Sequence, residues 1–149
     1  MEKSRREENV SQMQMKQGRS KRVLVVEDDK DDQEILSEVL SSMGFEVSLA
    51  KNGLEGLAVF VTDFFDLVLT DLQMPLMDGS RLTHFIKQLS PDSTVILLTG
   101  SDSEALSHKV ENVSFDGVLS KPSNLEDFRR VILGALGPRH GNQGAVGAL

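Results

Sequence analysis

Residues 66–79, D-L-V-L-T-D-L-Q-M-P-L-M-D-G, decide how the rest of the chain is interpreted. The apolar run at residues 67–70 is followed by Asp71 and then by a turn built on Pro75 and Asp78-Gly79. The run is typical of a buried strand, and such a strand does not need a carboxylate at its end. A single aspartate here is commonly a solvated loop residue. The role of Asp71 therefore depends on which side chains follow the other predicted strands.

Short apolar runs alternate with segments of helical period from Val23 to Leu136. The apolar runs predict strands at residues 23–26, 45–49, 67–70, 94–99 and 117–120. The segments of helical period predict helices at residues 35–43, 54–61, 82–89, 104–110 and 124–136. Asp31 or Asp32 is expected to cap the first helix. The last helix is expected to turn these side chains inward: Leu125, Phe128, Val131, Ile132 and Leu136. Because parallel strands need crossover helices, this alternation predicts a three-layer α/β domain with a mainly parallel sheet.

The composition is that of an ordinary soluble domain. With 149 residues the chain is long enough for one hydrophobic core, and a second domain is not expected. The chain has no cysteine, which excludes disulfides and thiolate metal sites. No apolar run approaches the roughly 20 residues of a membrane span, and the charged amino-terminal segment has no apolar signal-peptide core. The expected location is the cytoplasm, without membrane contact.

The charge is distributed unevenly along the chain. Residues 1–22 hold seven Lys or Arg and three Glu, whereas the remaining residues hold nine basic and twenty acidic side chains. A body this acidic repels a nucleic-acid backbone, so direct nucleic-acid binding by the domain is not expected. Residues 1–20 are predicted to be a flexible basic extension, because they have few apolar side chains and no periodicity. The folded domain is expected at residues 21–137, followed by a flexible glycine-rich tail at 138–149.

Side chains capable of chemistry follow four of the five predicted strands. They are Glu27, Asp28 and Asp29 after the first strand, Asp71 after the third, Thr99 after the fourth and Lys121 after the fifth. Parallel sheets bind ligands beyond the carboxyl ends of their strands, so these side chains are expected along one edge of one sheet. Each has an ordinary explanation by itself, as a helix cap, a structural threonine or a solvated lysine. Their combination predicts a site.

The charges at this edge predict a bound cation. Several carboxylates within a few ångström of one another oppose each other's ionisation, and one lysine does not offset three of them. A divalent cation would, and ligands that are all oxygen favour Mg²⁺ over softer metals. Mg²⁺ beside a carboxylate, an ammonium and a hydroxyl group is what phosphoryl transfer requires. An aspartate can be the nucleophile and form an acyl phosphate, and the residues alone leave open whether it is Asp28 or Asp71.

Four motifs of the chain resemble the receiver domain of bacterial two-component response regulators. They are V-L-V-V-E-D-D (23–29), L-V-L-T-D-L-Q-M-P-L-M-D-G (67–79), V-I-L-L-T-G (95–100) and L-S-K-P (119–122). Their order and mutual spacing fit the family from about Arg22 to Leu136. The resemblance implies the flavodoxin-like (βα)5 fold, whose five-stranded parallel sheet has the order 2-1-3-4-5. The first and third strands are then neighbours, which would bring Glu27, Asp28 and Asp71 together.

The resemblance also implies a role for each acidic residue. Asp71 corresponds to the phosphoacceptor. Asp28 corresponds to a direct Mg²⁺ ligand, alongside Asp71 and the backbone carbonyl of Gln73. Glu27 corresponds to a residue that acts on the metal partly through water.

Further positions correspond to residues that surround the phosphoryl group. Thr99 and Lys121 correspond to the two side chains that bind its oxygens. Lys121–Pro122 corresponds to a peptide bond that is commonly cis in the family. Pro75 and Gly79 correspond to residues that shape the loop after the phosphoacceptor.

One position departs from the family pattern. Receivers usually carry Tyr or Phe three residues before the conserved lysine, and Val118 stands there in a chain without tyrosine. A valine has only χ1 to change, so the usual movement of an aromatic ring is not expected. Phe115, nearby, is expected in the core. The signal would leave by another route, such as the loop after Thr99.

The resemblance implies a phosphorylation-operated switch rather than an enzyme with turnover. A sensor histidine kinase or a histidine phosphotransfer protein would donate the phosphoryl group to Asp71, and a downstream protein effector would sense the change. The domain would catalyse only its own phosphorylation and hydrolysis. An aspartyl-phosphate hydrolase is disfavoured because Gln73 stands where many of those enzymes have a second aspartate. A degenerate receiver that only binds partners is the other alternative. The sequence fits a stand-alone receiver, part of a longer regulator or the receiver of a hybrid kinase.

Overall fold

Five parallel strands form the sheet of this protein. The computed structural model describes residues 20–100, 115–121 and 124–137. The strands are β1 (Arg22–Val26), β2 (Glu46–Ala50), β3 (Leu67–Asp71), β4 (Val95–Thr99) and β5 (Gly117–Ser120). Their order in the sheet is β2-β1-β3-β4-β5, and every neighbouring pair is parallel. The predicted flavodoxin-like order is confirmed.

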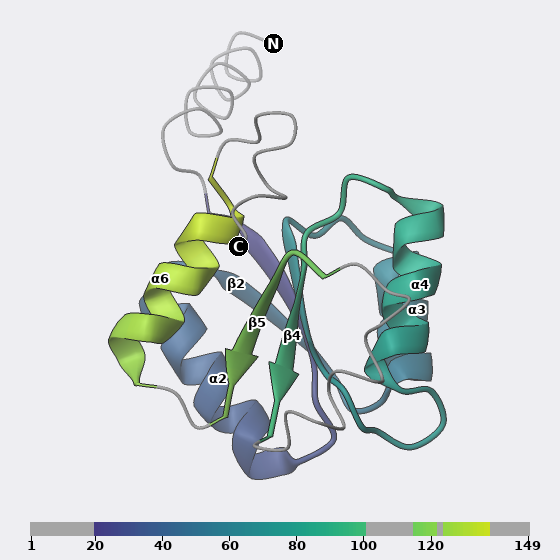
Figure 1. Ribbon diagram of the computed structural model, residues 1–149, viewed down its shortest axis with the longest axis horizontal. Coiled ribbons are helices and arrows are strands. Elements are labelled where there is room, and N and C mark those ends of the chain that lie inside the picture. The colour runs from purple at the N-terminus through teal and green to yellow at the C-terminus, as the bar shows by residue number, and fades with distance from the viewer. Residues whose placement is uncertain (1–19, 101–114, 122–123, 138–149) are drawn as a thin grey trace, which may run out of the picture.

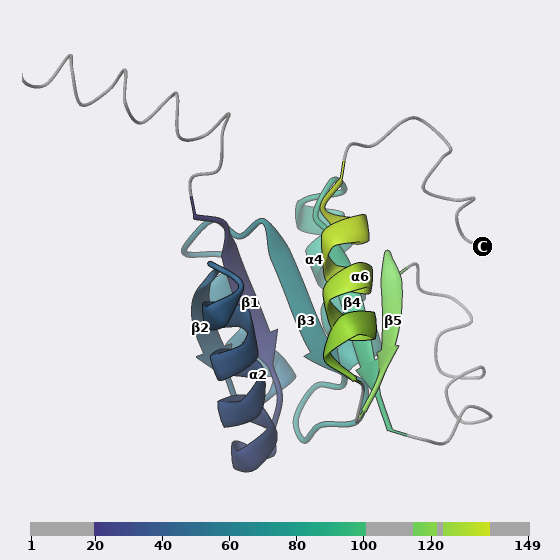
Figure 2. The ribbon, with the colours of Figure 1, turned by 90° about the vertical axis from the view of Figure 1, so that its left-hand side faces the viewer.

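Helices cover both faces of this sheet and make the fold three-layered (Figure 1). They are α2 (Lys30–Ser42), α3 (Gly53–Phe60), α4 (Gly79–Leu89) and α6 (Leu125–Ala135). Helices α2 and α6 lie on one face, and α3 and α4 lie on the other; a second view shows α2 and α6 together in front of the strands (Figure 2). Among the described residues, no helix is both long and apolar enough to cross a membrane. The predicted helix at 104–110, the predicted flexible tail at 138–149 and residues 1–19 of the predicted flexible extension at 1–20 lie outside the described residues.

Strand β1 shows how the core is divided between the two faces. Val23 and Val25 belong to the apolar cluster under α2 and α6, whereas Leu24 and Val26 belong to the cluster under α3 and α4. Successive strand residues point to opposite faces, so a strand covered on both sides is apolar throughout. Strand β4 follows the same rule, because every residue from 95 to 99 is buried.

Each described helix begins with a side chain that caps its backbone. Asp29, Asn52, Asp78 and Asn124 stand directly before α2, α3, α4 and α6, and each side chain accepts the N–H of the residue three positions later. Such caps satisfy donors that the helix itself leaves without a partner. The prediction that Asp31 or Asp32 caps the first helix is wrong, because both residues lie inside its first turn.

One expected core residue lies at the surface. The side chain of Leu125 is 56% exposed, although helical spacing placed it on the inward face of the last helix. Leu125 is the first residue of α6, whereas Phe128 and Ile132, one and two turns later, are buried. The apolar stripe therefore begins one turn before the helix reaches the core.

Two carboxylates at the amino edge of the sheet tie neighbouring strands together. Asp66, directly before β3, accepts the backbone N–H of Arg22 at the start of β1, with 2.8 Å between nitrogen and Oδ2. Asp116, directly before β5, accepts the backbone N–H of Val95 at the start of β4, also at 2.8 Å. Lys87 of α4 adds an ion pair to Asp116 at 2.8 Å. We refer to these two aspartates as the strand clasps.

Candidate functional site

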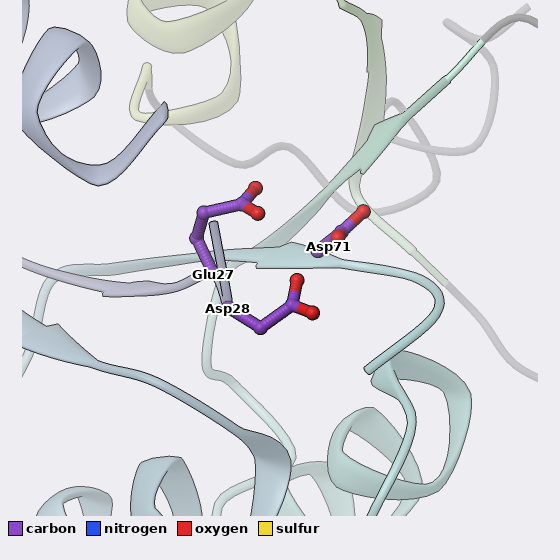
Figure 3. A group of neighbouring side chains, drawn as sticks. All are labelled: Glu27, Asp28 and Asp71. Carbon is purple, nitrogen blue, oxygen red and sulfur yellow. The ribbon is translucent and has the colours of Figure 1, made fainter. Parts of the chain in front are cut away.

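The carboxyl edge of the sheet gathers three acidic side chains from two neighbouring strands. Asp71 is the last residue of β3, and Glu27 and Asp28 follow the last residue of β1. One carboxylate oxygen of each residue lies within 4.8 Å of the others. Figure 3 shows the three side chains gathered at this edge. They come together because β1 and β3 pair in register, with Val26 opposite Thr70.

Glu27 is the buried member of this group. It is 1% exposed, and its carboxylate accepts the N–H of Asp29 at 3.0 Å and the ammonium of Lys121 at 2.9 Å. Its backbone is held as well, because its N–H donates to Ala50 and its carbonyl accepts the side-chain amide of Gln33. Burial raises the pKa of Glu27, the hydrogen bonds from Lys121 and Asp29 oppose the rise, and the nearby charge of Asp71 adds to it. The protein therefore holds a carboxylate where ionisation is unfavourable.

Asp71 lies beside this pair and is partly accessible. Its side chain is 14% exposed, and Oδ1 lies 3.6 Å from Nζ of Lys121. The N–H of Leu72 donates to the same oxygen at 2.9 Å. Burial raises the pKa of Asp71 and the charge of Asp28 adds to the rise, while Lys121 and the Leu72 N–H lower it.

Lys121 is the cation of the site and contacts carboxylates from three elements. Its Nζ lies 2.9 Å from Glu27, 3.4 Å from Asp32 and 3.6 Å from Asp71. Burial alone would lower the pKa of Lys121, but the hydrogen bond to Glu27 and the charges of Asp71, Glu27 and Asp32 raise it well above its ordinary value. Lys121 is therefore fully protonated at neutral pH.

Thr99 and Lys121 are joined through the backbone. The N–H of Lys121 donates to the carbonyl of Thr99 at 2.7 Å, one step beyond the pairing of Thr99 with Ser120. Thr99 is buried at the end of β4, and its hydroxyl contacts the carbonyl of Gly100 at 3.3 Å. This hydroxyl and the Lys121 ammonium are presented by adjacent strands.

The loop after Asp71 is tightly packed at two glycines. A Cβ on Gly79 would lie 2.1 Å from the carbonyl oxygen of Asp71, and a Cβ on Gly53 would lie 2.2 Å from that of Met77. The Gly79 N–H closes the loop by donating to Leu72 at 2.7 Å. Gly79 was expected to shape this loop, and its contact with Asp71 gives the steric reason.

Three other residues considered in the sequence analysis lie outside this network of contacts around Lys121. Gln73 is exposed in the loop after Asp71. Val118 is 47% exposed on the edge strand β5. Phe115 is partly buried and packs against the cluster under α3 and α4. The predicted cis bond at Lys121–Pro122 lies outside the described residues, because Pro122 is not described.

Two contacts of the site were not predicted from the sequence. Asp32 pairs with Lys121, and Asp29 both caps α2 and donates its N–H to Glu27. The run of acidic residues at 27–29 and 31–32 indicated an acidic site, but the sequence could not tell which of these residues would contact Lys121. Asp31 and Asp32 lie on different sides of the first turn of α2. Which of the two faces the site depends on where the helix begins, and therefore on which residue is its N-cap.

The acidic group fits a hard divalent cation. Its potential ligands are all carboxylate oxygens, close enough to share one ion. Burial is the main cause of the raised pKa values of Glu27 and Asp71, and the charge of a neighbouring carboxylate adds to each, so a bound cation would favour their ionised forms. Glu27, Asp28 and Asp71 are thus the residues that would hold Mg²⁺.

Known proteins share both this sequence and this fold. Residues 23–133 match the response regulator receiver domain family. The chain is 35% identical over 108 residues to the response regulator receiver protein CpdR of Brucella abortus, covering 72% of this chain and 90% of that protein. It is 35% identical over 102 residues to a response regulator receiver protein of Anaeromyxobacter sp. (68% and 43%), and 33% identical over 110 residues to the sensor histidine kinase RcsC of Escherichia coli (74% and 12%). The chain therefore spans less than half of the latter two relatives.

A solved structure gives the same result. The response regulator protein TrrA of Thermotoga maritima, in complex with Mg²⁺ and BeF, superposes with a TM-score of 0.71 at 30% identity, covering 77% of this chain and 98% of that chain. The strand order, the acidic group at the carboxyl edge and the family match agree. The chain belongs to the response regulator receiver domain family of two-component signalling systems.

Proposed function

We propose that Asp71 accepts a phosphoryl group, with Mg²⁺ bound by Asp28, Asp71 and the backbone carbonyl of Gln73, and by Glu27 through water. The observation that carries this proposal is the position of Asp71, which lies beside two further carboxylates and 3.6 Å from the Lys121 ammonium. A nucleophile, a place for a cation and a fixed ammonium thus lie at one edge of the sheet. This is the set of groups that phosphoryl transfer to a carboxylate needs.

Asp71, Lys121 and Thr99 would have different roles in the transfer. A carboxylate oxygen of Asp71 forms a bond to phosphorus while the bond from phosphorus to the donor's imidazole nitrogen breaks, and the electron pair stays on that nitrogen. Lys121 offsets negative charge on the phosphoryl oxygens, and the Thr99 hydroxyl donates a hydrogen bond to another oxygen. When bound, Mg²⁺ would neutralise the remaining charge of the acidic group. The domain has no further substrate and acts as a switch rather than as an enzyme with turnover.

The phosphoryl donor and the downstream effector follow from this chemistry. A sensor histidine kinase or a histidine phosphotransfer protein supplies the phosphoryl group, and a downstream protein effector binds the altered surface, in the cytoplasm. Because Val118 has no ring to reorient, the change would be expressed through the strand ends at Thr99 and Lys121. The two residues share a backbone hydrogen bond, which couples β4 to β5 at the site.

Phosphorylation by a small donor tests the proposal. The protein is incubated with Mg²⁺ and acetyl phosphate, and its intact mass is recorded for wild type, Asp71→Asn and Asp92→Asn. Asp92 is an exposed carboxylate before β4, at the other end of the sheet. We expect a hydroxylamine-labile phosphate on wild type and Asp92→Asn but not on Asp71→Asn. Absence of any adduct, together with absence of Mg²⁺ binding, would favour the degenerate receiver that only binds partners.

A further inference from the structure

We propose that Asp32 is a positioning residue that competes with phosphorylated Asp71 for the ammonium group of Lys121. The inference rests on the proposed function, since it concerns the lysine that would bind the phosphoryl group. It assigns a role to a carboxylate of α2 that neither holds the metal nor accepts the phosphoryl group.

The geometry around Lys121 places three carboxylates in competition. Nζ has three hydrogens to donate, and Glu27, Asp32 and Asp71 already lie 2.9, 3.4 and 3.6 Å away, so a phosphoryl group on Asp71 that needs more than one hydrogen must take it from another carboxylate. Glu27 and Asp71 come from the ends of β1 and β3, whereas Asp32 comes from the first turn of α2. Asp32 therefore attracts the ammonium from a helix, whereas Asp71 attracts it from a strand.

The three carboxylates differ in how easily they release the lysine. Glu27 is 1% exposed, so losing its cation would leave a buried charge unpaired, which is costly. The side chain of Asp32 is 40% exposed, so water can solvate it after the ammonium leaves. Lys121 can thus exchange Asp32 for a phosphoryl oxygen at small cost. The stronger the contact of Lys121 with Asp32, the weaker is the net binding of a phosphoryl group by Lys121.

The position of Asp32 is fixed by the cap of its helix. Its backbone N–H donates to the Asp29 side chain at 2.9 Å, and the Asp29 N–H donates to Glu27 at 3.0 Å. The first turn of α2 is thereby tied to the site. The neighbouring Asp31 lies in the same turn and is exposed, and it is not among the ion-pair partners that the structure gives for Lys121. Asp31 is therefore a matched control, with the same charge and in the same helical turn.

Binding of a phosphoryl mimic measures the competition. The full chain, saturated with Mg²⁺, is titrated with beryllium fluoride in an isothermal titration calorimeter. Wild type, Asp32→Asn, Asp32→Glu and Asp31→Asn are compared, each also with Lys121→Met. Removing one competitor of an exposed ion pair should tighten binding by about two- to fivefold in Asp32→Asn relative to Asp31→Asn. Asp32→Glu should bind like wild type, and the difference should vanish with Lys121→Met, where no ammonium remains.

Each result separates the inference from the function on which it rests. Equal affinities of Asp32→Asn and Asp31→Asn, with wild type binding normally, would overturn the role of Asp32 and leave the proposed function standing. A difference that persists with Lys121→Met would also overturn it, because the effect would then be a general charge effect. Failure of wild type to bind the mimic at all would overturn the proposed function, and the competition with it.

Discussion

Gly79 lies so close to Asp71 that a single methyl group cannot be placed between them. A Cβ on Gly79 would be 2.1 Å from the carbonyl oxygen of Asp71 and 3.1 Å from the Cα of Leu72. The first residue of α4 thereby fixes the backbone that carries the proposed phosphoacceptor. The requirement for glycine is steric, since these neighbours are backbone atoms that cannot rotate away.

Gly79→Ala is expected to destabilise the protein by about 2 kcal/mol or more, because the loop or the helix must move to admit the methyl group. Urea unfolding measures the change. Gly134→Ala is the matched control: a Cβ there meets nothing within 4 Å, and the residue lies inside α6. That variant should gain about 0.5–1 kcal/mol. Equal effects of the two substitutions would contradict the close approach of Gly79 to Asp71.

Mg²⁺ should stabilise the folded protein by relieving repulsion within the acidic group. At about ten times the dissociation constant, a ligand that binds only the native state adds about 1.4 kcal/mol to the free energy of unfolding. We expect this gain in wild type and in Asp92→Asn, a strongly reduced gain in Asp28→Asn, and reversal by a chelator. Thermal unfolding with and without Mg²⁺ measures it. A gain that survives Asp28→Asn unchanged would place the ion elsewhere.

The ion pair between Asp63 and Arg22 predicts a pH dependence of stability at the other end of the sheet. The guanidinium of Arg22, which donates to Oδ2 at 2.7 Å, lowers the pKa of Asp63 from 3.8 to about 2. A carboxylate with a lowered folded pKa contributes stability above its unfolded pKa, and this stability is lost as pH falls toward the folded pKa. Wild type should therefore be more stable than Asp63→Asn above about pH 4. The difference should shrink between about pH 4 and about pH 2, as measured by urea unfolding across that range. A difference that is constant with pH would refute the ion pair.

Thr83 offers a substitution that should stabilise the protein. It is fully buried in α4, and its hydroxyl is the buried side-chain polar atom without a hydrogen-bond partner among the described residues. Burying an unpaired hydroxyl group costs about 1–3 kcal/mol, and valine has nearly the same shape. Thr83→Val should therefore be more stable by about 1 kcal/mol, whereas Thr83→Ser keeps the hydroxyl and should be less stable. A loss of stability in Thr83→Val would mean that the hydroxyl has a partner.

Neighbouring residues of β5 should respond very differently to truncation. Val118 is half exposed on the edge strand, whereas Leu119 is buried under α2 and α6. Leu119→Ala should cost about 2–5 kcal/mol and Val118→Ala less than about 1 kcal/mol. Val118→Ala should still accept a phosphoryl group from acetyl phosphate at the wild-type rate, because Val118 has no place in the chemistry. A slowed rate would show that this position is coupled to the site after all.

The fold could be predicted from the sequence because two independent patterns agreed. The alternation of apolar runs with helical periods gave the strands and helices, and the strand positions are recovered to within a residue or so, as for 67–70 against Leu67–Asp71. The order of the strands came from the family resemblance. Helix starts were less predictable, since several residues that can cap follow one another before α2.

The site was predictable only as a set of strand ends. Parallel pairing places Glu27, Asp28 and Asp71 at one edge whatever the side-chain rotamers are. Contacts that depend on rotation about a helix axis, such as that of Asp32 with Lys121, have no sequence signal. The strand clasps were missed for a similar reason, because an aspartate before a strand is ordinarily a turn residue.

The strand clasps have a consequence for how the sheet can move. Asp66 joins the starts of β1 and β3, and Asp116 joins the starts of β4 and β5, so both act at the amino edge. A one-residue slip of either strand pair would break its clasp, which fixes the register independently of the core. Asp71 lies at the opposite, carboxyl edge of the sheet, so neither clasp depends on the contacts of the acidic site. Substitutions within the acidic site should therefore leave the register of both strand pairs unchanged.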